Sequence, residues 1–311
     1  MSVALVIDAS CDLPLSLINE HDISVLPVSI FTNGRELLDW RHPDTTLSYY
    51  QEHLVDKGNE VTTQPVTTEE AIRLLSEGPL RKADYVLVQT TSRTRSETFD
   101  RLTEAAYELN VRLKREQPQR TVRVMDSHAL FAGQGLIAAH TQALIRKGLE
   151  GSQLRRAAAV VADHTHTLVI PPDLYYIRER ARQRGETSIT LVRALLGRTL
   201  GITPIVCGYR DNHFPAAKFK GFAAAVEGAA AQILKQVDKK ALRSPYVSIS
   251  YAGDLTELTQ FEGVGHLRER HQAGDIRLII STMGLAGATY LGPGAMSMGV
   301  ACDENEWSHP D

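Results

Sequence analysis

The chain has 311 residues, of which 43% are hydrophobic and 23% are charged, and its formal net charge is −3. This is the composition of a globular chain long enough for two domains. A slightly acidic balance without a block of Lys and Arg argues against nucleic acid as a partner. No apolar run reaches the roughly 18–20 residues that a membrane span needs, so we expect no integral membrane segment. The chain has no signal-peptide pattern, and its three cysteines lack metal-site spacing, which together favour the cytoplasm.

Three apolar runs in the N-terminal half are each followed directly by hydroxyl or carboxylate side chains. The runs cover residues 3–7, 85–88 and 122–125. The polar residues that follow them are Asp8 and Ser10, then Thr90, Thr91 and Ser92, then Asp126 and Ser127. Because ligands of open α/β sheets bind beyond the carboxyl ends of the strands, these residues predict one polar rim on one parallel sheet.

Helical and further strand patterns lie between these runs. They comprise a strand at 23–31, a helix from Thr67 to about residue 75 with Glu70 completing a capping box, a helix at 96–116, and a helix to about 147 preceded by Gly133 and Gly135. Strands that alternate with helices predict a Rossmann-like, doubly wound parallel sheet over residues 1–150.

The alternation of strand and helix patterns is interrupted near residue 150. We expect residues 151–311 to form a second α/β domain with a mixed sheet. We expect helices at 152–163, 187–199, 222–239 and 255–271, and strands at 204–209, 247–251, 278–281 and 298–301. About eight residues at the end have the composition of a disordered tail.

The acidic residues of the first motif do not have the spacing of a known nucleophile pair. Asp8 and Asp12 are four positions apart, not two as in aspartate-based phosphotransferases, so Asp8 is interpreted as an orienting residue or a helix cap. Neither Ser10 nor Cys11 has a base adjacent in the sequence. A stand-alone transferase or hydrolase that uses Asp8, Ser10 and Asp126 is the alternative function.

Hydroxyl side chains at 62–63 and 90–92 are the candidate binding groups. Hydroxyls donate and accept hydrogen bonds without carrying charge, so Thr62, Thr63 and Ser92 can hold carboxylate or phosphate oxygens. Helix N-termini nearby would assist. Plain capping and turn chemistry is the alternative interpretation, and it explains Thr67 well.

Other polar features have simpler explanations. His164 and His166 are expected to be surface residues, because no third metal ligand has useful spacing. Every second residue after residue 177 is an arginine: Arg178, Arg180, Arg182 and Arg184. The simplest interpretation is a solvent-exposed cationic face, and the more specific hypothesis is a surface that docks a partner protein. Gly292 and Gly294 indicate a tight turn that lets the backbone approach a ligand or another domain.

A series of segments, in matching order and spacing over nearly the whole chain, resembles the DegV family. That family comprises fatty-acid-binding proteins that supply the lipid-carrying subunit of bacterial fatty acid kinase. The segments are Ile7-Asp8-Ala9-Ser10-Cys11-Asp12-Leu13-Pro14, Val25-Leu26-Pro27-Val28, Thr62-Thr63-Gln64-Pro65, Ser92 with Ser96-Glu97-Thr98-Phe99, Asp126-Ser127, Gly133-Gln134-Gly135-Leu136, Asp173-Leu174-Tyr175-Tyr176-Ile177, Ile202-Thr203-Pro204-Ile205, Lys218-Phe219-Lys220-Gly221 and Gly292-Pro293-Gly294-Ala295.

The resemblance implies two α/β domains with an acyl chain buried between them. It implies that Thr62 or Thr63, together with Ser92, holds the carboxylate of a long-chain fatty acid, with Tyr290 nearby. The loops at Asp8, Ser10, Asp126, Ser127, Gly292 and Gly294 would support this site. The partner implied is an ATP-dependent kinase subunit that phosphorylates the bound acid. The chain itself would have no catalytic residues, no metal and no cofactor besides its lipid.

The chain departs from the family pattern at the head-group site. The family has His two positions before the Gly-Pro-Gly turn, where this chain has Tyr290, and a phenol carries no charge near pH 7. Arg180-Ala181-Arg182 stands where the family has Gly-Gly-Arg, and Thr203 replaces a Lys. A lipid-sensing module that changes its interdomain geometry on binding is the third hypothesis.

Overall fold

The computed structural model describes residues 1–183 and 201–309. The helix predicted at 187–199 lies outside them. In the described part of the chain, no helix is both long and apolar enough to cross a membrane.

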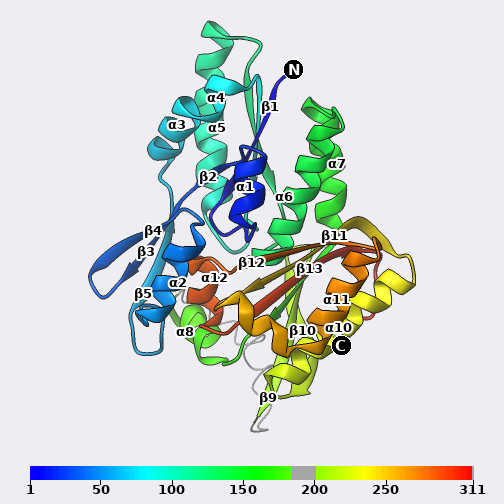
Figure 1. Ribbon diagram of the computed structural model, residues 1–311. Helices are drawn as coiled ribbons and strands as arrows, with labels where there is room; N and C mark the ends of the chain where they lie inside the picture. Colours follow the sequence, from blue (N-terminus) through cyan, green and yellow to red (C-terminus); the bar gives the residue numbers. More distant parts are fainter. Residues whose placement is uncertain (184–200, 310–311) are drawn as a thin grey trace.

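A four-stranded parallel sheet forms the upper part of the molecule in Figure 1, in the order β2-β1-β6-β7. Its strands are β1 (Val3–Asp8), β2 (Ser24–Leu26), β6 (Tyr85–Thr90) and β7 (Thr121–Asp126). The helices around it are α1 (Leu15–Glu20), α3 (Thr68–Glu77), α4 (Pro79–Lys82), α5 (Thr98–Glu116), α6 (Phe131–Arg146) and α7 (Gly151–Asp163). The side chain of Thr67 caps α3 by accepting from the backbone N–H of Glu70.

Helices cover both faces of this sheet, because alternate strand residues point to opposite sides. Val6 and Val88 pack in a cluster with Leu102 of α5, while Leu87 packs with Leu136 of α6. The strands are therefore apolar on both faces, as expected for a doubly wound sheet.

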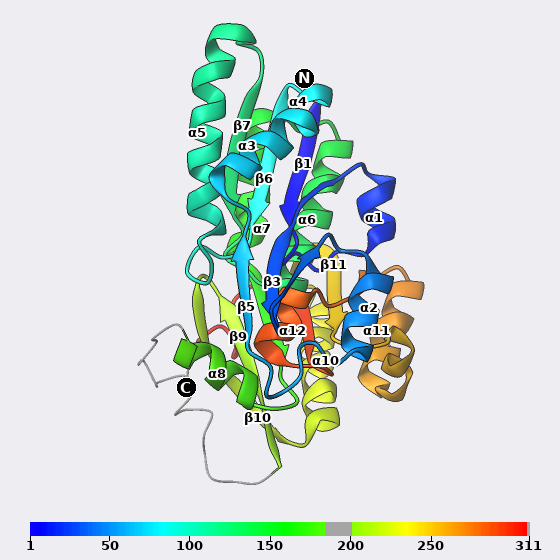
Figure 2. The same cartoon turned by 90° about the vertical axis from the view of Figure 1, so that its left-hand side faces the viewer.

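The single strand predicted at 23–31 is wrong, because Pro27 divides it. Pro27 has no N–H for a ladder hydrogen bond. After it the chain leaves β1 and enters a three-stranded antiparallel sheet in the order β4-β3-β5. Its strands are β3 (Val28–Thr32), β4 (Arg35–Asp39) and β5 (Val61–Pro65), and α2 (Pro43–Gln51) follows β4. Figures 1 and 2 show this small sheet reaching down beside α8 and α12 of the other half.

A six-stranded mixed sheet forms the second half, in the order β10-β9-β8-β13-β11-β12. Its strands are β8 (Thr165–Ile170), β9 (Ile202–Tyr209), β10 (Asn212–Lys220), β11 (Leu242–Tyr251), β12 (Arg277–Thr282) and β13 (Met296–Cys302). The helices are α8 (Tyr175–Gln183), α10 (Phe222–Asp238), α11 (Glu262–Gln272) and α12 (Leu285–Leu291). The helix predicted at 255–271 is instead a 3₁₀ turn, Leu255–Gln260, followed by α11. The predicted class, two α/β units with a parallel and a mixed sheet, is confirmed.

Helix α6 lies between the two sheets and is buried all round over its first nine residues. Gly133 and Gly135 were expected to precede this helix, but they lie inside it. A methyl group on Gly133 would lie 2.0 Å from the hydroxyl of Thr167, and one on Gly135 2.2 Å from the carbonyl oxygen of Asp12. Only glycine permits both approaches. The predicted domain boundary at residue 150 falls in the connection between α6 and α7 and stays a prediction.

A buried ion pair joins the loop after β1 to the loop after β4. A guanidinium nitrogen of Arg41 lies 3.1 Å from the carboxylate of Asp12, and both side chains are almost fully buried. The same Asp12 oxygen accepts the N–H of Gly284, and Arg41 donates to the carbonyl of Thr282. The pair therefore ties the first half of the chain to the segment between β12 and α12.

Two expectations for the second half are wrong. His166 is buried, not a surface residue: it stacks on Tyr209 at 4.1 Å, and burial lowers its pKa to about 4. Its Nε2 also hydrogen-bonds to Ser308 at 2.8 Å. Ser308 is itself buried, so the chain is packed against β8 well into the expected tail.

Candidate functional site

A cavity of about 730 Å³ lies between the two halves of the molecule. This volume is within the range of about 300–1,000 Å³ usual for small-molecule sites. The larger part of its wall is apolar. The apolar lining comprises Val28, Leu130, Phe131, Val169, Ile177, Val206, Ala286 and Leu291.

Strand alternation explains why this face of the six-stranded sheet is open to the cavity. Leu168 and Ile205 pack on the opposite face with α10, so their neighbours Val169 and Val206 point to the cavity side. These two valines are paired in register on β8 and β9. Val28 of β3 and Ala286 and Leu291 of α12 line the same cavity, so this part of its wall is aliphatic.

Polar side chains gather at the other part of the cavity wall. They come from the end of β1, from β5, from the loop that follows β6 and from β10: Ser10, Thr63, Thr91, Arg93, Thr94, Arg95, Ser96 and His213. The start of α5 adds Glu97, Thr98, Asp100 and Arg101. Polar groups at one part of an otherwise apolar cavity suit an amphiphilic ligand.

Asp8 organises the rim at the carboxyl ends of the strands. Its carboxylate accepts the N–H of Ser10 at 2.9 Å, the N–H of Thr91 at 2.6 Å and the side-chain amide of Gln134 at 3.1 Å. Burial raises the pKa of this carboxyl despite the three donors. With its oxygens occupied by loop donors, Asp8 is placed to orient the rim and not to attack a substrate.

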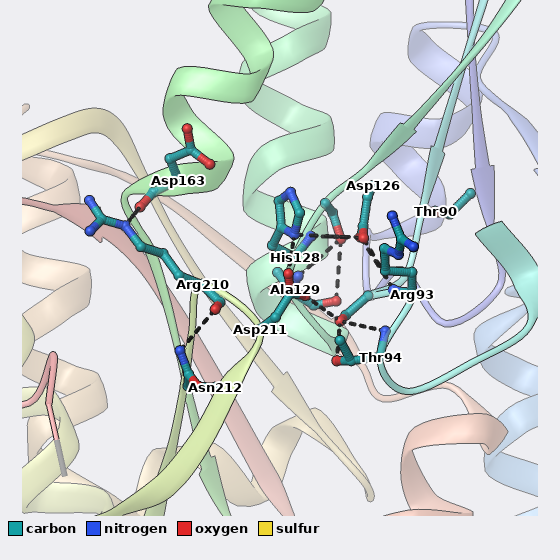
Figure 3. Close-up of polar contacts among 12 residues, drawn as sticks. Thr90, Arg93, Thr94, Asp126, His128, Ala129, Asp163, Arg210, Asp211 and Asn212 are labelled. Carbon is teal, nitrogen blue, oxygen red and sulfur yellow. Dashed lines mark hydrogen bonds and ion pairs between the residues drawn. The ribbon is translucent and has the colours of Figure 1, made fainter. Parts of the chain in front are cut away.

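A second carboxylate cluster joins the rim to the β9–β10 hairpin (Figure 3). Nδ1 of His128 lies 2.6 Å from one carboxylate oxygen of Asp211, and the hydroxyl of Ser92 donates to the other at 2.8 Å. Asp126 accepts the N–H groups of His128 and Arg93. Because Asp211 has a φ of 63° at the hairpin turn, its side chain can reach the rim of the other half.

Three of these side chains also have the composition of a metal site. One ligand atom each from Asp126, His128 and Asp211 lies within 4.8 Å of the others. The hydrogen bonds above already satisfy these groups, so the arrangement is explained as a contact between the two halves without an ion.

The structure separates the two threonines of the predicted carboxylate site. Thr63 lines the cavity, whereas Thr62 is exposed on the other face of β5. Their cross-strand partners on β3, Ile30 and Phe31, alternate in the same way. Thr62 is not among the residues that line the cavity, and its role at the head group stays a prediction.

Some of the remaining predicted residues line the cavity, and others form hydrogen bonds within the loops around it. Tyr290 and Ser10 line the cavity. Ser92 is fully buried and does not line it, since its hydroxyl is engaged by Asp211 and Thr94. The hydroxyl of Ser127 donates to the carbonyl of Ala129 and so stabilises the loop between β7 and α6.

Gly292 and Gly294 form the expected tight turn after α12, with φ values of 89° and 77°. A methyl group on Gly292 would lie 2.4 Å from the ring of Tyr176 in α8. The N–H of Gly294 bonds to the carbonyl of Ala252. The turn allows close approach to another part of the protein.

The three predicted partner-facing arginines lie on α8 in different environments. Arg178 and Arg182 are exposed. Arg180 is 8% exposed and donates to the backbone carbonyls of Thr289 and Val61, so its expected surface position is wrong. The helical period turns residue 180 toward α12 and β5.

Sequence reasoning missed Arg95 and His213 as cavity residues. Nε of Arg95 lies 3.3 Å from Nδ1 of His213, and both side chains line the cavity. His213 is the second residue of β10. Its position follows from the antiparallel pairing of β10 with β9, which sets it opposite Gly208.

A two-domain α/β protein with a cavity between its sheets is the class that the fold and site define. A family model described as "Uncharacterised protein, DegV family" matches residues 2–303. The chain is 33% identical over 317 residues to a DegV domain-containing protein of Xanthomonas axonopodis pv. citri, covering 99% of this chain and 100% of that protein. A DegV domain-containing protein of Xanthomonas campestris pv. campestris matches with the same identity and coverage. The chain belongs to the DegV family.

Solved structures share the fold. A DegV lipid-binding protein of Thermotoga maritima superimposes with a TM-score of 0.77 at 18% identity, covering 98% of this chain and 100% of that one. A DegV family protein of Thermus thermophilus, described for fatty acid binding, gives 0.75 at 22% identity, with coverage of 97% and 100%. The Fatty Acid Kinase (Fak) B3 protein of Streptococcus pneumoniae, loaded with linoleic acid, gives 0.74 at 16% identity, again covering 97% and 100%.

Proposed function

We propose that this protein binds a long-chain fatty acid in the cavity between its sheets. The observation that carries the proposal is the division of the cavity wall into a large aliphatic part and a polar part. Family membership supports it, since neighbours with the same fold are described as binding fatty acids. The hydrocarbon would contact Val169, Val206 and Ala286, and the carboxylate would lie toward Thr63.

The energetics suit such a ligand. Each methylene group removed from water contributes about 0.8 kcal/mol, so a long chain supplies most of the binding free energy. Few polar contacts are then needed to orient the head group. Thr63 and Tyr290 line the cavity and are proposed to supply hydroxyl contacts, while Ser92 and Asp8 hold the rim in place.

A series of saturated acids tests this proposal. We expect affinity, measured by calorimetry on lipid-free protein, to rise about fourfold per added methylene from octanoic acid upward, until the cavity is full. Affinity that is independent of chain length, or absent throughout the series, would contradict the proposal.

We further propose that the protein presents the bound carboxylate to an ATP-dependent kinase subunit and performs no catalysis alone. The Streptococcus neighbour, a Fatty Acid Kinase B3 protein, supports this partner class. Of the predicted docking arginines, Arg178 and Arg182 are exposed on α8, and Ile177 of the same helix lines the cavity.

Charge reversal on α8 tests the docking face. The double variant Arg178→Glu/Arg182→Glu is expected to slow kinase-dependent acyl phosphate formation at least tenfold, because two attractive charges become repulsive. Lipid binding by the same variant should be unchanged. Undiminished turnover with the kinase would remove α8 from the interface, and acyl phosphate formed by the chain with ATP alone would favour an enzyme.

A further inference from the structure

Arg95 and His213 meet in the cavity from opposite halves of the molecule. Arg95 belongs to the loop between β6 and α5, and His213 to β10 of the mixed sheet. The Nε–H of Arg95 donates to Nδ1 of His213 at 3.3 Å, and both residues line the polar part of the cavity. The pair therefore forms where the two halves close on each other.

The imidazole of this pair is neutral at physiological pH. Burial, and then the charge of Arg95, lower the pKa of His213 to about 4. Because Nδ1 accepts from Arg95, the proton of the neutral ring is assigned to Nε2, which makes that atom a donor. The pair can thus offer a hydrogen-bond donor beside a guanidinium.

The other arginines on this wall have different surroundings. The guanidinium of Arg93 is exposed and lies 5.3 Å from the ring centre of Phe99. Arg101 donates to the carbonyl of Pro65 and pairs with Glu97 at 2.8 Å. Arg95 is half-buried and contacts His213 of the other half of the molecule, whereas the partners of Arg101 belong to its own half.

We propose that Arg95, oriented by His213, makes the cavity selective for an anionic head group. This inference rests on the proposed binding of a fatty acid and names the residues that distinguish an acid from a neutral lipid. Thr63 and Tyr290 offer only neutral hydroxyls, which bind an alcohol as readily as a carboxylate. A guanidinium forms charge-assisted hydrogen bonds, which are about twice as strong as neutral ones. Arg95 therefore supplies a charge that Tyr290 lacks.

The test compares hexadecanoic acid with 1-hexadecanol, which has the same chain and a neutral head. Binding of each is measured by fluorescent-probe displacement on lipid-free wild-type protein, Arg95→Met, Arg95→Lys and His213→Phe. Methionine keeps an apolar stem of similar reach but removes the charge. Arg115→Met is the matched control, because Arg115 is exposed on α5 and does not line the cavity.

We expect Arg95→Met to weaken binding of the acid about 10- to 100-fold and to leave binding of the alcohol within about twofold. Arg95→Lys should recover part of the loss, and His213→Phe should show a smaller loss confined to the acid. Arg115→Met should change the binding of neither ligand. Unchanged acid affinity in Arg95→Met, or equal losses for both ligands, would overturn the inference while fatty acid binding stands. Wild-type protein that binds neither ligand would overturn the proposed function itself.

Discussion

Arg41→Met is expected to lower the free energy of unfolding by about 3–5 kcal/mol, the largest stability effect that we predict. The substitution removes the guanidinium that lies 3.1 Å from the carboxylate of Asp12. Asp12 is 1% exposed and would be left as a buried charge without a cation. Urea denaturation followed by circular dichroism measures the loss.

The pH dependence of the variant gives a second, independent check. Burial already raises the pKa of Asp12, and Arg41 opposes that shift, so removing Arg41 raises the pKa further. When the folded-state pKa exceeds the unfolded one, the folded state binds more protons, and stability rises as pH falls between the two values. Arg41→Met should therefore gain stability as pH falls through the raised pKa of Asp12 toward the pKa of an unfolded aspartate. The double variant Asp12→Asn/Arg41→Met should be more stable than Arg41→Met, and a single variant within about 1 kcal/mol of wild type would contradict the prediction.

Val206→Trp is expected to weaken binding of hexadecanoic acid strongly and of octanoic acid little. Val206 is 5% exposed and points into the aliphatic part of the cavity beside Val169. An indole there takes space from the distal part of a long chain. The loss of three buried methylenes costs about 2.4 kcal/mol, which is about 60-fold in affinity.

Val160→Trp is the matched control for this prediction. Val160 is 55% exposed on α7, so the same indole is placed on the surface, away from the cavity wall. Calorimetry on both variants, with circular dichroism to verify folding, distinguishes obstruction from unfolding. A folded Val206→Trp protein that binds hexadecanoic acid as tightly as wild type would place the acyl chain elsewhere.

Much of the fold could be predicted from local patterns. Apolar runs that end in Asp8 and Asp126 became parallel strands with their carboxyl ends on one rim, because periodicity and strand direction are local properties. The continuous β pattern at 23–31 did not reveal that the segment forms two strands, which lie in different sheets on either side of Pro27. The burial of α6 between two sheets hides its amphipathic period, and the close packing at Gly133 depends on tertiary contacts.

The site was predictable only in part, because its wall is assembled from both halves. The hydroxyls at 62–63 indicated the strand β5, of which Thr63 lines the cavity. Ser92 was located at the rim, but its contact with Asp211 depends on a hairpin more than a hundred residues away. No local pattern brings Arg95 to His213, since they meet only when the two halves close.

The most direct test of the central claim is to denature purified protein and identify the released small molecules by mass spectrometry. We expect one long-chain fatty acid per protein chain in wild type and a shorter or missing acid in Val206→Trp. Wild-type protein that releases no lipid and also fails to bind added acid, or that releases a different class of metabolite, would contradict it.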